Sequence, residues 1–290
     1  MFRLFGRYFV REPVTQFSGL SDEAWVNLLM RSVTEPVLEG IRMPGFPDAQ
    51  TQTKTVGYHG EEALRYATPF YLLVKKYALE LDRPIDATTR VLDFGCGWGR
   101  ILRFFLKDCQ TAHLHGIDVD PTLLRICRST FPYCKFQKVK PLPPTRFANA
   151  SFDIIVGYSV FSHLAEHASL AWVQEFSRLL RPGGLMLVTT QPRDFIAFCE
   201  SFRGKDNKFG WYKQLANSFV DVEASYAAFD AGQYLHAPTG GGPSRPADFY
   251  GETMIPEGYV RRHFTKFLRY VEVVADRTLL EQTLIVMQKT

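Results

Sequence analysis

Cysteine is scarce in this 290-residue sequence, and its five copies include no CxxC pair. An odd number of cysteines without such a pair argues against a disulfide framework and against a zinc site, and it favours a reducing cytoplasm. No apolar stretch approaches the ~18 residues that span a bilayer. Arg3, Arg7 and Arg11 also interrupt the start of the chain, where a signal peptide needs an apolar run. We therefore expect a soluble cytoplasmic protein with no metal and no stable membrane insertion.

An excess of one charge is also missing. Lysine and arginine number 34 and aspartate and glutamate number 30, which leaves a difference of 34 − 30 = +4. Nucleic-acid binding requires a clustered basic surface, so the expected partner is a small molecule and not a nucleic acid. The 46% of apolar residues is ordinary for a globular protein. The composition leaves the choice between a monomer and a homodimer open.

Residues 1–85 are expected to form a helical leader that acts as a lid. A helix over about residues 61–81 contains Pro69, which should kink or split it. Nearer the start, Arg3, Arg7 and Arg11 share a helical face. Such a basic face suits either an anionic membrane or docking on the protein's own domain, and we favour docking.

The pattern changes between residues 86 and 192, where short apolar runs alternate with amphipathic segments. The runs cover 90–94, 113–117, 152–158 and 185–189, and the segments cover 101–106, 121–127 and 170–180. This alternation predicts βαβ units around a parallel sheet. Residues 259–290 should add a helix and two strands joined by a short link. That link is too short for a parallel crossover, so the last pair should be antiparallel.

A glycine-rich turn follows the first apolar run. Asp93 is the penultimate residue of that run, and Gly95, Gly97 and Gly99 come at alternate positions after it. Glycine permits positive φ and lets a ligand approach the backbone. Ligands of open α/β sheets bind at the carboxyl ends of the strands, beside such a turn. Arg100 stands where a dinucleotide-binding turn has its third glycine, so a pyrophosphate is not the expected ligand.

A carboxylate closes the next apolar run. Asp118 lies 21 residues after Gly97, and an acid at this place can accept hydrogen bonds from both hydroxyls of a ribose. Asp118 could instead cap the helix that follows, but Asp120 stands directly before Pro121 and already suits that position. We therefore interpret Asp118 as a ribose ligand.

At this point the sequence resembles the class I S-adenosylmethionine-dependent methyltransferases, of the small-molecule type. The resemblance covers about residues 88–192 and rests on four blocks in order: Asp93–Gly99, Gly116–Asp118, Ser151–Ile155 and Leu179–Gly184. It implies a Rossmann-like, doubly wound α/β fold with a mostly parallel seven-stranded sheet that ends in an antiparallel hairpin. The helical leader would precede this core (86–192), and an insertion (193–258) would precede the hairpin.

The resemblance also implies a cofactor site for S-adenosylmethionine. The cofactor-binding residues would be Asp93, Gly95, Cys96, Gly97, Gly99, Asp118, Val119 and Ser159. Asp93 would hold the amino group of the methionine part, Asp118 the ribose, and Val119 would pack on the adenine. The segment 140–144 carries no acid for the adenine amino group, which departs from many members of the family.

Candidate catalytic residues lie at and just after the end of the run 152–158, and candidate substrate-side residues lie in the insertion. His163 has the chemistry of a general base, although it could instead cap a helix or bind a loop carbonyl. Tyr158 is a second catalytic candidate beside it. Twelve aromatic residues lie between 195 and 250 and could form a lid or a small core of their own. From this segment we assign His236, Tyr250 and Trp211 to the substrate side.

Together these features predict methyl transfer to an oxygen or nitrogen of a small or medium-sized acceptor. Stand-alone bacterial methyltransferases of biosynthetic and glycan pathways share this looser pattern. Two alternatives stay open on the sequence. One is an NAD(P)-dependent oxidoreductase, which also uses a glycine-rich turn, and the other is a non-catalytic module that binds S-adenosylmethionine.

Overall fold

A seven-stranded sheet forms the centre of the computed structural model, which describes residues 13–131, 134–205 and 210–290. The strand order is β10-β11-β7-β6-β3-β4-β5. The strands are β3 (Val91–Phe94), β4 (Leu114–Asp118), β5 (Lys135–Lys138), β6 (Phe152–Gly157), β7 (Leu180–Thr190), β10 (Arg269–Val274) and β11 (Thr283–Gln288). The pairs among β3 to β7 are parallel, and β11 pairs antiparallel with both β7 and β10. The predicted Rossmann-like sheet with a terminal antiparallel hairpin is confirmed.

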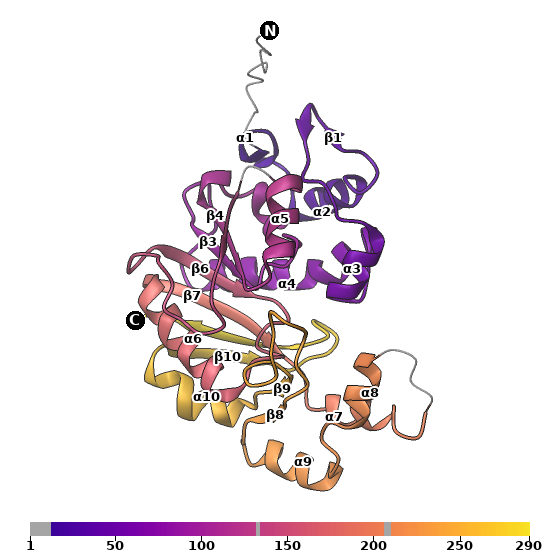
Figure 1. Cartoon of the computed structure of the whole chain (residues 1–290). Helices are drawn as coiled ribbons and strands as arrows, with labels where there is room; N and C mark the ends of the chain where they lie inside the picture. Colours follow the sequence, from indigo (N-terminus) through magenta and orange to yellow (C-terminus); the bar gives the residue numbers. More distant parts are fainter. Residues whose placement is uncertain (1–12, 132–133, 206–209) are drawn as a thin grey trace.

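Helices cover both faces of this sheet (Figure 1). They are α1 (Pro13–Phe17), α2 (Asp22–Arg31), α3 (Ala49–Val56), α4 (Gly60–Glu80), α5 (Pro121–Thr130), α6 (Glu166–Leu179), α7 (Phe195–Glu200), α8 (Gly210–Ala216), α9 (Val222–Asp230) and α10 (Glu257–His263). Successive strand residues point to opposite faces. Val91 therefore packs with α2 and α4, whereas Leu92 packs with α6 and α10. In the described part of the chain, no helix is both long and apolar enough to cross a membrane.

The leader packs onto one face of the sheet. Trp25 of α2 is fully buried, and its indole N–H donates to the carbonyl of Phe104, 2.7 Å away. Helix α4 runs through Pro69 as a single element, so of the kink or split expected at this proline the split does not occur. Its buried stripe continues across the proline, from Ala67 to Phe70, and this packing compensates for the missing N–H donor. Arg3, Arg7 and Arg11 lie outside the described residues.

The insertion has a small apolar core of its own. This core joins α7 and α8 to a two-stranded ribbon, β8 (Leu235–Ala237) and β9 (Glu252–Met254). Leu215 and Met254 are fully buried in it. Figure 1 shows α8 and α9 to one side of the sheet, whereas β8 and β9 lie beside the core. A second short ribbon, β1 (Val37–Leu38) and β2 (Ile41–Arg42), belongs to the leader.

A buried histidine in β4 predicts acid sensitivity of the fold. His115 packs edge-on against Phe147 and Phe152, and burial together with the nearby Lys135 lowers its pKa to about 4. The unfolded chain then binds a proton between about pH 6.5 and 4 that the folded chain does not, so stability falls as the pH drops through this window. We expect wild type to lose roughly 1–2 kcal/mol more than His115→Leu between pH 7 and 4.5 in urea unfolding. Equal losses would contradict this role.

Candidate functional site

The glycine-rich turn after β3 is packed on one side and open on the other. Gly95, Gly97 and Gly99 all have positive φ, at 69°, 54° and 82°. The N–H groups of Gly95 and Cys96 donate to the carbonyl of Ile117, which fixes the turn against the end of β4. A Cβ on Gly95 would lie 2.5 Å from Cγ2 of Val160, whereas a Cβ on Gly97 would meet no atom within 4 Å. A ligand can therefore approach the backbone at Gly97.

The carboxylate of Asp118 lies directly beside this turn. Its Oδ2 accepts a hydrogen bond from the N–H of Gly97 at 2.9 Å, and its Oδ1 accepts one from the N–H of Asp120 at 2.8 Å. Burial raises the pKa of Asp118. The neighbouring Asp120 caps α5 through the N–H of Thr122, as the sequence indicated. Asp118 is thus oriented by two backbone donors and is not the helix cap.

Asp93 carries a buried carboxylate oxygen that lacks a partner. The residue is 1% exposed at the end of β3, and its Oδ2 has no hydrogen bond. Burial, assisted by the nearby Asp118, raises the pKa of Asp93 well above its usual value, and the cation of Arg100 opposes this shift. An unpaired buried carboxylate is costly, so this position favours a ligand that brings hydrogen-bond donors or positive charge. Arg100 itself is buried and donates to the carbonyl of Ala63 in α4.

Cys96 and Val119, two other predicted cofactor residues, lie in the glycine-rich turn and directly after β4, respectively. The side chain of Cys96 is buried against Cys127 and Leu124, so only its backbone can face a ligand. Val119 is half-buried directly after β4. The side chains of Cys96 and Cys127 pack beneath the glycine turn, and Cys127 Sγ donates to the carbonyl of Gly97.

The segment after β6 is held in a strained conformation. Ser159 has a φ of 60°, which costs a residue with a side chain about 1–2 kcal/mol. Its N–H donates to Thr189 Oγ1, and its hydroxyl accepts a hydrogen bond from Gln282 Nε2 at 3.0 Å. Tyr158 points toward the leader, where its hydroxyl donates to the carbonyl of Tyr66 at 3.3 Å. Burial raises the pKa of Tyr158.

His163 and the three predicted residues of the insertion lie around the buried strand β9. These three residues are Trp211, His236 and Tyr250. His163 Nδ1 contacts the carbonyl of Gly251 at 2.8 Å, and its ring stacks on Tyr250 with 4.8 Å between the centroids. The indole N–H of Trp211 donates to Glu252 at 2.8 Å. His236 Nδ1 contacts Thr253 Oγ1, and burial lowers the pKa of His236 to about 4, which keeps its ring neutral at pH 7.

Four functional residues predicted from the sequence lie near β9, but a fifth, Glu252, was missed. The four are His163, His236, Tyr250 and Trp211. Glu252 is 1% exposed in β9, and its Oε2 lies 3.6 Å from His163 Nδ1. The two residues are 89 positions apart, and no motif in the insertion marks the acid. Its only signal was an acidic residue inside a short strand-like segment.

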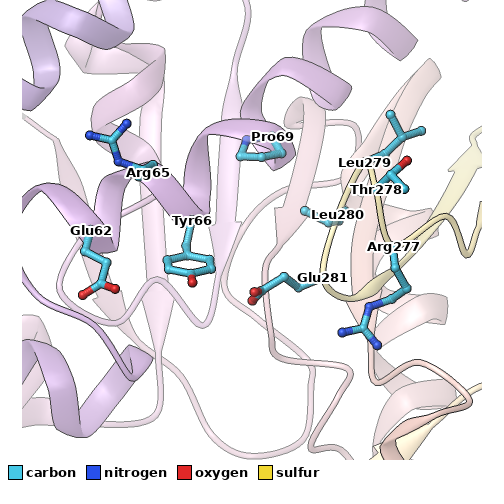
Figure 2. Close-up of a pocket in the computed structure, with 9 residues that line it drawn as sticks. All are labelled: Glu62, Arg65, Tyr66, Pro69, Arg277, Thr278, Leu279, Leu280 and Glu281. Atoms are coloured by element: carbon cyan, nitrogen blue, oxygen red, sulfur yellow. The ribbon is translucent and has the colours of Figure 1, made fainter.

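A pocket of about 440 Å³ opens between α4 and the link from β10 to β11. Figure 2 shows Tyr66 and Glu62 of α4 facing Glu281 across it. Glu281 of this lining is followed by Gln282, whose side chain donates to the hydroxyl of Ser159, two residues after the end of β6. Arg277 also lines the pocket but is paired with Asp194.

Comparisons with known proteins relate the part of the chain that carries the glycine-rich turn to methyltransferases. Residues 91–184 match the family model of a methyltransferase domain. A trans-aconitate 2-methyltransferase of Methylobacterium nodulans is 30% identical over 110 residues, which cover 36% of this chain and 39% of that protein. A ribosomal protein L11 methyltransferase of Cupriavidus metallidurans is 25% identical over 183 residues, which cover 61% of this chain and 57% of that protein. The chain thus spans less than two thirds of either relative.

A solved structure supports the fold. An S-adenosylmethionine-dependent methyltransferase from Clostridium acetobutylicum superposes with a TM-score of 0.53 at 11% identity, covering 77% of this chain and 92% of that one. The core of this chain is a class I S-adenosylmethionine-dependent methyltransferase domain. These comparisons favour the methyltransferase family over the alternative of an NAD(P)-dependent oxidoreductase.

The site fits the cofactor of this methyltransferase family. The unpartnered Oδ2 of Asp93 suits the ammonium group of S-adenosylmethionine, and the open face of Gly97 suits a ligand that touches the backbone. Asp118 lies next to that face, within reach of a ribose that crosses the turn. Bound there, the cofactor would supply a methyl group already activated by the sulfonium.

Proposed function

We propose that this chain transfers a methyl group from S-adenosylmethionine to an oxygen or nitrogen atom of a small or medium-sized acceptor. The observation that carries the proposal is the pairing of an open glycine turn with two buried carboxylates, Asp93 and Asp118, on the same side of the sheet. No ion pair in the described part of the chain includes either carboxylate, and the charges of Arg100 and Arg245 act on them only electrostatically. A nucleoside with a charged amino-acid tail would satisfy both.

The pocket in Figure 2 supports a small acceptor. Its volume of about 440 Å³ falls within the range of small-molecule sites, about 300–1,000 Å³. It adjoins Ser159 through Gln282, and Ser159 contacts Ser162, which precedes His163. An acceptor entering here would approach the carboxyl end of β6, where the family resemblance assigns the sulfonium.

The protein's task in this reaction is positioning and proton removal. The acceptor's lone pair forms the bond to the methyl carbon, and the electrons of the broken carbon–sulfur bond remain on sulfur. The acceptor also loses a proton, and His163 Nε2 is the group we assign to take it. Holding donor and acceptor in line supplies a large part of the barrier reduction.

The acceptor class can be tested by a screen for S-adenosylhomocysteine release. Carboxylic acids, phenols and primary amines would be offered in parallel, together with ribosomal protein L11, because one relative is named for that protein and another for trans-aconitate. Release with one small-molecule class supports the proposal. Release only with ribosomal protein L11 would overturn the assignment of a small acceptor. Binding of the cofactor without release of S-adenosylhomocysteine for any acceptor would favour the non-catalytic alternative.

Replacing His163 with alanine should lower turnover about 100-fold, because general-base catalysis contributes at least that much in many enzymes. The affinity for S-adenosylhomocysteine should stay within about twofold, since His163 lies on the acceptor side of the site. The measurement is steady-state kinetics with the acceptor from the screen, beside calorimetry. His167→Ala, an exposed histidine of α6, is the matched control. Unchanged turnover in His163→Ala would return His163 to a structural role.

A further inference from the structure

The contacts of His163 determine which of its ring nitrogens carries the proton. Nδ1 lies 2.8 Å from the carbonyl oxygen of Gly251, which can only accept a hydrogen bond. Nδ1 must therefore be the protonated nitrogen, and Nε2 is left with a free lone pair in the neutral ring. Stacking on Tyr250 holds the plane of the ring. This is the tautomer that a base acting through Nε2 requires.

A second group faces the same Nδ1. Oε2 of Glu252 lies 3.6 Å from it, is buried, and has no hydrogen-bond partner of its own. The other oxygen, Oε1, accepts a hydrogen bond from the indole of Trp211, which fixes the carboxylate. Glu252 thus has one oxygen held by the insertion and one oxygen directed at His163.

We propose that Glu252 is a positioning residue that stabilises the positively charged ring of His163 after Nε2 has accepted the acceptor's proton. This inference rests on the proposed methyl transfer. The proton moves from the acceptor heteroatom to Nε2, and Glu252 does not take part in this transfer. A buried anion near a developing cation is strongly stabilising because water does not screen it. Trp211 extends the arrangement to α8, so the insertion helps to build the base.

Other charged or titratable groups also surround the ring. His236 in β8 and His167 in α6 both act electrostatically in this region, and burial keeps His236 neutral at pH 7. Arg245 lies over the ring of Tyr250, 5.4 Å from its centroid. Cys199 of α7 lies near Glu252, and burial raises the pKa of Cys199 to about 12, so this thiol also stays neutral. Glu252 is therefore the anion that faces His163.

The test is ring ¹⁵N nuclear magnetic resonance on the full chain saturated with S-adenosylhomocysteine, with His163 assigned by its loss in His163→Gln. Wild type should show the Nδ1–H tautomer. At pH 6, the charged fraction of the ring should fall about threefold or more in Glu252→Gln and recover in Glu252→Asp. Trp211→Phe keeps the charge and should change this fraction less. Glu175→Gln removes another buried carboxylate, one of α6 that is paired with Arg178, and should leave this fraction unchanged.

Each outcome decides the proposal. An Nε2–H tautomer in wild type, or an unchanged charged fraction in Glu252→Gln, would overturn it. Kinetics with the screened acceptor give a second readout, in which Glu252→Gln should lower kcat about tenfold and leave both KM values nearly unchanged. When His163 is already alanine, Glu252→Gln should not lower kcat further. Failure of S-adenosylhomocysteine to bind would count against the proposed function, and the spectra of the free protein would still test Glu252.

Discussion

Replacing Asp118 with alanine is expected to weaken the binding of S-adenosylhomocysteine about tenfold or more, which is about 1.4 kcal/mol. The substitution removes the carboxylate that would accept hydrogen bonds from the ribose, and hydrogen bonds to charged groups contribute about 1.5–3 kcal/mol. It also frees the N–H of Gly97, which Asp118 holds at 2.9 Å. Isothermal titration calorimetry on the two proteins measures the effect.

Asp120→Ala provides a matched control two residues away. Asp120 accepts hydrogen bonds from Thr122 and Leu123 at the start of α5 and does not touch the glycine turn. Its loss should lower the free energy of unfolding by about 1 kcal/mol and leave cofactor affinity within about twofold. Asp118→Asn should lie between wild type and Asp118→Ala, because the amide keeps one acceptor oxygen. Equal affinities of wild type and Asp118→Ala would remove Asp118 from the cofactor site.

The buried strands could be predicted from the sequence because their pattern is local. The last two strands were expected within residues 259–290, and β10 and β11 lie there. Strand β5 was missed because its sequence, Lys-Phe-Gln-Lys, lies at the sheet edge and contains no apolar run. The segment from Ile101 to Leu106 was expected as an α-helix, and the structure has a 3₁₀ helix at Leu102–Leu106. Edge position and tertiary packing decided these cases.

The arrangement of residues at the glycine-rich turn could likewise be predicted, whereas the surroundings of His163 could only be outlined. The contact between Asp118 and Gly97 follows from topology, since parallel neighbouring strands end at the same edge of the sheet. The contact between Glu252 and His163 joins β9 of the insertion to the loop after β6, and no periodicity relates those segments. The composition indicated an aromatic-rich insertion. Its contact with His163 depends on side-chain packing between distant segments, which cannot be read from a single sequence.

Gly97→Ala should abolish most of the affinity for S-adenosylhomocysteine while leaving the ligand-free fold largely intact. A Cβ at this position meets no protein atom within 4 Å and would occupy the open space beside the turn. The backbone strain of a side chain at positive φ costs about 1–2 kcal/mol of stability. We expect a loss of affinity of about tenfold or more, measured by calorimetry beside urea unfolding.

Gly204→Ala separates backbone strain from ligand exclusion. Gly204 has a φ of 70°, and a Cβ on it would likewise meet no atom within 4 Å, but this glycine follows α7 in the insertion. The free energy of unfolding should therefore fall by a similar amount in both variants, and only Gly97→Ala should lose affinity for S-adenosylhomocysteine. Because strain is common to the pair, the difference in affinity reports whether the ligand touches the turn. Undiminished binding by Gly97→Ala would mean that the cofactor lies elsewhere, and the roles assigned to Asp93 and Asp118 would fall with it.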